Sequence, residues 1–88
     1  MRNEWLRQKV TVQEAEAMNL VINEKWPQGL PFGYLSSGWQ ELLHKKQDGD
    51  EIWTYGSSEE SWANLMGQEG IALVRNGEII DALITCEN

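Results

Sequence analysis

The first periodic segment of the chain has the pattern of an amphipathic helix. Thr11 and Glu14 stand at the spacing of a capping box, in which the two side chains accept hydrogen bonds from free backbone amides at a helix start. Apolar residues recur every three or four positions after this box, and Pro27 cannot continue a helix. The pattern predicts a helix over residues 12–26, with Leu20 on its charged side.

Two shorter helices are marked in the same way by serine residues. Ser37 and Ser57 each stand three positions before a Gln or Glu, and each is followed by a short stripe of Trp and Leu side chains. The two stripes predict helices over residues 37–47 and 58–66. The intervening residues 27–35 carry two prolines and two glycines without any period, so we expect a loop there.

The C-terminal third of the chain carries the pattern of strands. Residues 51–55 are rich in β-forming side chains and follow an Asp-Gly-Asp turn. Residues 71–75 and 78–86 flank Asn76 and Gly77, a dipeptide that tolerates the two positive φ angles of a type I′ turn. We therefore expect a β-hairpin, in which residues equally distant from the turn pair with each other.

Alternation then sorts the side chains of this hairpin into two faces. The first face is strongly apolar and is expected to form the core. The second is too apolar for free solvent, yet it holds one carboxylate, so another helix of the chain or a second copy should cover it. The first face holds Ile71, Leu73, Ile80, Ala82, Ile84 and Cys86, and the second holds Ala72, Val74, Ile79, Asp81, Leu83 and Thr85.

Together these elements predict a single α+β domain over residues 1–88, with residues 1–11 as an N-terminal segment of no assigned structure. The expected order is α-α-β-α-β-β, with a three-stranded sheet that ends in the type I′ hairpin and helices packed on one or both of its faces. The residues between the strand 51–55 and the hairpin are numerous enough for a helical crossover. Hydrophobic residues form 41% of the chain and five are tryptophans, which is enough apolar area for a folded core.

The net charge limits the kinds of partner that we expect, and the cysteine content indicates the cellular compartment. Seven Lys and Arg stand against 14 Asp and Glu, so the net charge of −7 repels phosphate backbones and anionic lipid. We therefore expect neither a nucleic acid nor a membrane as partner. The single cysteine cannot form an internal disulfide, and neither an apolar leader nor a long apolar run is present, which indicates the cytoplasm.

The second half of the chain, about residues 38–86, resembles a group of short bacterial proteins of uncharacterised function. The group carries no assigned activity, so the resemblance implies a bacterial, stand-alone domain and no mechanism. Many members have Pro where this chain has Ser58 or Glu59. The resemblance rests on the segments Gly38-Trp39-x-Glu41-Leu42, Gly49-Asp50-Glu51-Ile52-Trp53, Ser61-Trp62-x-x-Leu65-x-Gly67 and Gly70-Ile71-Ala72-Leu73-Val74-Arg75-x-Gly77-Glu78-Ile79-Ile80.

The residues that catalysis needs are scarce. His44, the only histidine, lies near the end of a predicted helix, and Cys86 lies on the predicted core face, where an apolar setting makes a thiol inert. One His and one Cys cannot form the usual zinc site, and no phosphate-binding glycine motif is present. We expect no catalytic, cofactor-binding or metal-ligating residues, no cofactor and no enzymatic activity.

Residues that could contact a partner are easier to find. Phe32 and Tyr34 stand in the irregular loop, where exposed aromatic side chains often anchor interactions. Trp53 and Tyr55 share one side of their strand, which faces either the core or a partner. The candidate partner contacts are Leu20, Phe32, Tyr34, Trp53, Tyr55, Asp81 and Leu83.

Three functions fit these patterns. The first is a non-catalytic protein-interaction module that acts as a homodimer. The second is a small acidic inhibitor, of the immunity or antitoxin type, that neutralises a basic partner. The third is a small-ligand or enzymatic pocket near Trp53, Trp62 and Asp81.

Overall fold

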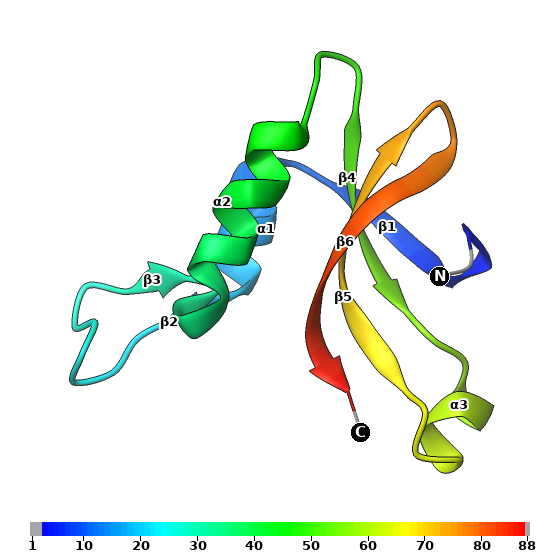
Figure 1. Cartoon of the computed structure of the whole chain (residues 1–88). Helices are drawn as coiled ribbons and strands as arrows, with labels where there is room; N and C mark the ends of the chain where they lie inside the picture. The colour runs from blue at the N-terminus through cyan, green and yellow to red at the C-terminus, as the bar shows by residue number, and fades with distance from the viewer. Residues whose placement is uncertain (1–2, 88) are drawn as a thin grey trace.

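The computed structural model describes residues 3–87 and shows an α+β fold built on two β-sheets (Figure 1). Four antiparallel strands form the main sheet in the order β1-β4-β5-β6, and β2 and β3 form a separate two-stranded sheet. Helices α1 and α2 lie on one side of the main sheet (Figure 1). In chain order the elements are η1 (Asn3–Trp5), β1 (Leu6–Val10), α1 (Val12–Met18), β2 (Leu20–Val21), β3 (Leu30–Pro31), η2 (Gly33–Leu35), α2 (Ser36–Lys45), β4 (Glu51–Gly56), α3 (Glu59–Ala63), β5 (Gln68–Arg75) and β6 (Glu78–Glu87).

The predicted order α-α-β-α-β-β and the predicted three-stranded sheet are therefore wrong. The main sheet has four strands because the N-terminal segment supplies β1, which pairs antiparallel with β4. β4 and β5 are also antiparallel neighbours, so α3 lies in the connection at one end of the sheet and does not cross over it.

The strand β1 was missed because its polarity does not alternate in the usual way. Leu6 pairs with Tyr55 and Gln8 with Thr54, so Arg7 is an extra residue, a β-bulge, between them. A bulge shifts the side chains beyond it to the other face, which breaks the two-residue period that identifies a strand. β1 is also an edge strand, where polar side chains are common.

Helix α1 is much shorter than the predicted helix over residues 12–26. Its capping box is present, with Thr11 accepting from the Glu14 amide at 3.0 Å and Glu14 accepting from the Thr11 amide at 2.9 Å. The helix ends at Met18, and the Asn19 side-chain amide donates to the carbonyl of Ala15 at 2.8 Å. Asn competes with helical hydrogen bonds in this way, so the chain turns into β2 at Leu20, well before Pro27.

The hairpin of β5 and β6 turns at Asn76 and Gly77, which have φ angles of 52° and 80°. Val74 pairs with Ile79 as predicted, but Leu73 pairs with Asp81, because Ile80 is an extra residue in β6. This bulge exchanges the predicted faces for Asp81, Ala82 and Leu83. Asp81 and Leu83 thus lie on the helical side of the sheet, while Ala82 lies on the opposite side.

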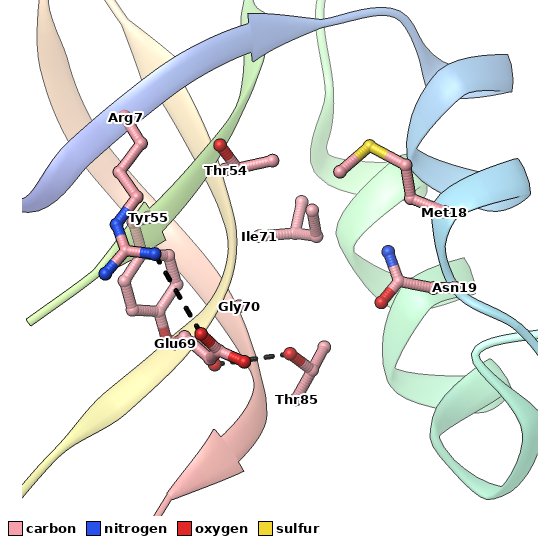
Figure 2. Close-up of a pocket in the computed structure, with 9 residues that line it drawn as sticks. All are labelled: Arg7, Met18, Asn19, Thr54, Tyr55, Glu69, Gly70, Ile71 and Thr85. Carbon is pink, nitrogen blue, oxygen red and sulfur yellow. Dashed lines mark hydrogen bonds and ion pairs between the residues drawn. The ribbon is translucent and has the colours of Figure 1, made fainter.

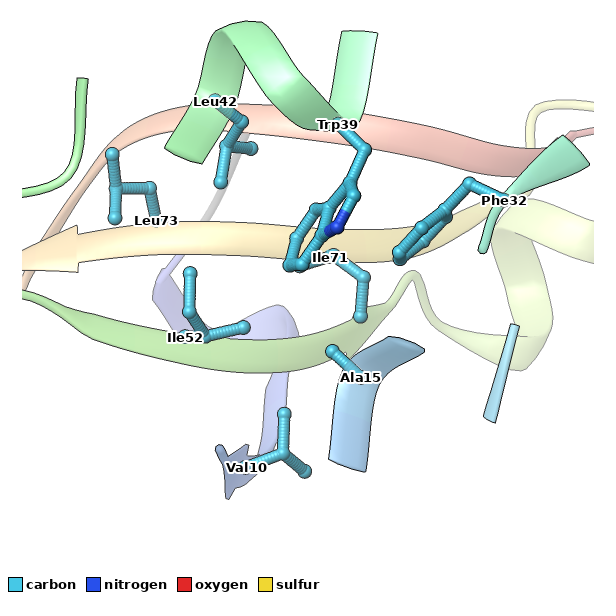
Figure 3. Close-up of a cluster of buried hydrophobic side chains, with 8 residues drawn as sticks. All are labelled: Val10, Ala15, Phe32, Trp39, Leu42, Ile52, Ile71 and Leu73. Carbon is cyan, nitrogen blue, oxygen red and sulfur yellow. The ribbon is translucent and has the colours of Figure 1, made fainter. Parts of the chain in front are cut away.

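The main core lies between the sheet and the two longer helices. Trp39 projects from α2 onto Ile71 and stacks on Phe32, with ring centroids 4.5 Å apart (Figure 3). Its indole N–H donates to the carboxylate of Glu16 in α1 at 2.9 Å, so one side chain joins both helices to the sheet. The buried residues of this cluster are Val10, Ala15, Phe32, Trp39, Leu42, Ile52, Ile71 and Leu73.

The opposite face of the sheet has a smaller cluster, and residues of the same chain cover part of it. Tyr55, Ala72 and Val74 are buried there, with Trp5 of η1 packed against them. Asn3 holds η1 against the hairpin of β5 and β6. Its side chain donates to the carbonyl of Gly77 at 3.0 Å and accepts from the amide of Ile79 at 3.4 Å. The cover expected for this face thus comes at least partly from η1.

An ion pair ties the hairpin to the loop before β4. The Arg75 guanidinium donates to both carboxylate oxygens of Asp50, at 2.9 and 2.7 Å, and the amide of Gln47 donates to the same carboxylate at 2.9 Å. The hydrogen bonds from Arg75 and Gln47 lower the pKa of Asp50 from its ordinary 3.8 to about 2. The carboxylate is therefore ionised over the neutral and mildly acidic range.

Candidate functional site

The segment between α1 and α2 exposes an unusual amount of apolar surface. We call residues 18–35 the arm; it includes β2, β3 and η2, and its two-stranded hairpin extends away from the main sheet (Figure 1). Of the nine exposed large apolar side chains among the described residues, five belong to the arm. These are Met18, Leu20, Ile22, Tyr34 and Leu35, with exposed fractions of 60, 44, 64, 78 and 40%.

Aromatic and glycine contacts hold the arm in shape. The rings of Trp26 and Tyr34 meet edge to face with centroids 4.7 Å apart, and the ammonium of Lys25 lies 5.2 and 5.0 Å from them. Gly33 has a φ of 52°, and a Cβ there would come within 2.8 Å of the Val21 side chain. These contacts give the arm a defined shape, in which Trp26 and Lys25 pack against the Tyr34 ring.

The arm is joined to the core through Phe32. This residue has a φ of 64° and is 5% exposed, and its amide donates to the carbonyl of Asn19 at 2.8 Å. Its ring stacks on Trp39, as described above. The prediction of Phe32 as an exposed anchor thus disagrees with its position, because the left-handed backbone turns its side chain inward.

Charge is distributed very unevenly between the two parts of the chain. Residues 1–35 contain four basic and four acidic residues, whereas residues 36–88 contain three basic and ten acidic residues. The whole excess of negative charge thus lies in the second part. Within the arm the charged residues are Glu24 and Lys25, so the arm is an apolar surface with no net charge.

The remaining candidate contacts lie on the main sheet. Trp53 and Tyr55 belong to the cluster under η1, where Trp53 is partly buried and Tyr55 is 1% exposed. Asp81 faces α2, and Lys45 donates to its carboxylate at 2.7 Å, which lowers the pKa of Asp81 and raises that of Lys45. Leu83 packs against the main core.

The pocket predicted near Trp53, Trp62 and Asp81 is not assembled from these residues. Trp53 pairs with Ala72, on the face under η1, while Asp81 pairs with Leu73, on the helical face. The two side chains therefore point to opposite sides of the sheet. The ion pair with Lys45 and a bond from the Ala82 amide at 2.8 Å give Asp81 a structural role.

Sequence reasoning missed three of the arm residues, Met18, Ile22 and Leu35. Met18 and Ile22 were assigned to the buried stripe of a helix over residues 12–26, and they are exposed because α1 ends before that stripe is complete. The signal that could have found them is Asn19, a residue that favours helix ends over helix interiors.

The one histidine and the one cysteine of the chain lie on different elements. His44 and Cys86 are both exposed, and they stand on α2 and at the end of β6. Within residues 3–87 there is no cluster of three or more His, Cys, Asp or Glu side chains that could hold a metal ion. Nor is any helix in this range long and apolar enough to cross a membrane.

Comparison with known proteins adds no identity. No family model matches the chain, and the searches of curated proteins and of solved structures found no match either. The resemblance of residues 38–86 to short bacterial proteins thus stays a prediction, and the geometry of the arm is the main guide to function.

Proposed function

We propose that the protein is a non-catalytic interaction module that forms a homodimer through the arm. The observation that carries the proposal is the concentration of five exposed large apolar side chains in residues 18–35. Exposed large apolar side chains gathered in one segment of a small protein are typical of an interaction surface. A short two-stranded hairpin cannot bury such side chains by itself, so a partner that covers them removes apolar area from water.

Charge supports a second copy of the chain as that partner. Two molecules of net charge −7 repel each other, and the repulsion is weakest where they can meet through a surface without net charge. The arm is such a surface, since its one Glu is balanced by one Lys. A twofold dimer would place the same apolar side chains of both copies together.

Light scattering of the purified chain over a wide concentration range tests this proposal. We expect a dimer mass, and we expect the monomer mass when Ile22 and Tyr34 are both replaced by Glu, because each replacement puts a carboxylate into the contact. Met66→Glu is the matched control, since Met66 is 72% exposed and follows α3, a helix that lies away from the arm (Figure 1). A wild-type monomer at all concentrations, or dissociation by the control variant, would contradict the proposal.

A second candidate function is the neutralisation of a basic partner protein. It is favoured by residues 36–88, which carry ten acidic and three basic residues. Attraction between opposite charges speeds such association and is screened by salt. The test is whether the product of the adjacent gene, if basic, binds the chain with an affinity that falls steeply between low and high NaCl; equal affinity in both would exclude this function.

A further inference from the structure

A pocket of about 250 Å³ lies between the main sheet and the end of α1 (Figure 2). Met18 and Asn19 form its wall on the helical side, and residues of all four strands form the other wall. The polar and apolar groups in it come from distant parts of the chain. The pocket is small by the standard of ligand sites, which commonly enclose roughly 300 to 1,000 Å³, so it suits a small molecule.

Two β-bulges at the same level of the sheet direct side chains into this pocket. Arg7 is the extra residue of β1 beside Tyr55, and Thr85 is the extra residue of β6 beside Gly70. Tyr55 and Gly70 are direct neighbours in the sheet, so the two bulges flank one row of residues. Bulges re-aim single side chains and are frequent next to binding sites.

The guanidinium of Arg7 is available to a ligand. It is half-exposed and forms a long ion pair with Glu69, in which nitrogen and oxygen are 4.0 Å apart, and within residues 3–87 it donates no hydrogen bond. Gly56 makes room for it, because a Cβ at that position would overlap the Arg7 guanidinium. A planar guanidinium with free N–H groups pairs best with a carboxylate, through two parallel hydrogen bonds.

The carboxylate of Glu69 gives the pocket a second, opposite charge. Figure 2 shows Arg7 and Glu69 side by side on the strand wall, and the Thr85 hydroxyl donates to the backbone carbonyl of Glu69 at 3.3 Å. A phosphate or another dianion would be repelled by Glu69 and by the acidic molecule around it. A simple cation would be repelled by the positive charge of Arg7. The charges of both residues are satisfied by a ligand that carries one anionic and one cationic group a few ångströms apart.

The rest of the pocket is neutral and partly apolar. Met18, which is 60% exposed, offers aliphatic surface to the pocket, while Ile71 lies almost fully buried behind the strand wall. Tyr55 also borders the pocket, but its side chain is buried in the cluster on the opposite face of the sheet, so it gives the pocket no charged group. The space beside the charged pair therefore accepts an aliphatic group.

We propose that this pocket binds a free α-amino acid with an aliphatic side chain, with the ligand carboxylate on Arg7 and its ammonium on Glu69. An α-amino acid has both charges on neighbouring atoms, which matches the close spacing of the two protein groups. The aliphatic side chain would lie against Met18. This site lies outside the proposed dimer contact except at Met18, which belongs to both surfaces.

The test is a titration of the isotope-labelled chain with L-leucine, followed by the backbone amide NMR signals. We expect saturable shifts at Gly70 and Thr85 at millimolar ligand, an affinity suited to so small a ligand. N-acetyl-leucine lacks the ammonium and leucine amide lacks the carboxylate, so each should bind at least roughly tenfold more weakly. The absence of shifts with L-leucine would overturn the proposal, and equal binding of either analogue would overturn the zwitterion assignment.

Two variants and a control separate the role of Arg7 from that of the fold. Arg7→Gln removes the charge, and Gly56→Ala keeps the charge but displaces the guanidinium; each should weaken L-leucine binding by at least roughly tenfold. Lys9→Gln removes a charge from the same strand, outside the pocket, and should leave binding unchanged. Equal binding by wild type and Gly56→Ala would contradict the proposal. Light scattering without ligand reports on the dimer separately.

Discussion

Apolar side chains are buried in the main sheet, whereas many of those in the arm are exposed. Ile52, Ile71 and Leu73 of the sheet are at most 2% exposed, because α1 and α2 cover them. Ile22 and Tyr34 of the arm are 64 and 78% exposed, although both belong to an ordered segment. The difference follows from size: two strands of two residues each have no second layer to pack against. Apolar residues in such a segment are explained best by a partner.

The two regions also differ in charge. Strands β4, β5 and β6, with α2 and α3, belong to the part of the chain that carries the whole excess of acidic residues, while the arm is neutral. Like surface charge keeps small proteins soluble and apart. The electrostatic repulsion between two copies is therefore weakest where they meet through the neutral, apolar arm.

The largest effect is expected at the point where the two regions meet. Trp39→Ala removes a fully buried ring that packs on Phe32 and bonds to Glu16, so it should lower the free energy of unfolding by roughly 3 to 5 kcal/mol. Urea denaturation followed by circular dichroism measures this loss. Tyr34→Ala, in the exposed part of the arm, should cost less than about 1 kcal/mol. Similar losses for the two variants would show that the arm is as tightly packed as the sheet.

Glycine replacements compare the backbones of the two regions. A Cβ at Gly70 would overlap the backbone carbonyl oxygen of Leu83, which cannot move without opening the sheet. Gly70→Ala should therefore lower the free energy of unfolding by roughly 1 to 3 kcal/mol. At Gly29 in the arm, a Cβ meets only the flexible end of Leu20, and the cost should come mainly from the φ of 90°, about 1 kcal/mol. The same denaturation measurement compares the two, and a larger loss for Gly29→Ala would contradict this ranking.

Acid should weaken the sheet region through Asp50. Because its pKa is lowered to about 2 in the folded chain, the ionised carboxylate stabilises the fold above its ordinary pKa of 3.8. This contribution is lost as the pH falls from about 4 through about 2, where the folded chain must take up the proton. Thermal unfolding between pH 7 and pH 2 measures it, and Asp50→Asn should remove this part of the acid response. Asp48→Asn, at an exposed position in the same loop, should leave the acid response unchanged.

The smallest effect is expected for Tyr55→Phe. The Tyr55 hydroxyl is buried and has no hydrogen-bond partner among residues 3–87, so its removal loses no hydrogen bond. The free energy of unfolding should stay within about 0.5 kcal/mol of the wild type or rise slightly at neutral pH. Above pH 10, Phe should be the more stable variant, since the raised pKa of Tyr55 favours the unfolded chain as its hydroxyl ionises. A marked loss of stability at neutral pH would reveal a partner for this hydroxyl.

Local patterns predicted the features that depend on a few neighbouring residues. The capping box of Thr11 and Glu14 marks where α1 begins, and Asn76 and Gly77 mark where the hairpin turns. Tyr34 was recognised as exposed because it stands in an irregular segment. Features that depend on register were not predictable in this way. Single extra residues at Arg7 and Ile80 change which face the following side chains occupy, and neither bulge has a sequence signal as clear as the turn.

Local sequence was enough to predict the α+β composition, the start of α1, the turn of the hairpin and the net charge, because each of these depends on residue type or on contacts a few positions apart. It did not give the cap of α2, which begins at Ser36 without a side-chain cap, or that of α3, which is capped by Ser58. Only the tertiary structure decided that β1 completes a four-stranded sheet, that α1 ends at Met18, that Asp81 faces Lys45, and that Arg7 and Glu69 meet in one pocket. These outcomes depend on pairing between distant segments. Such pairing is settled by which arrangement buries the most apolar surface, and a local pattern does not contain that comparison.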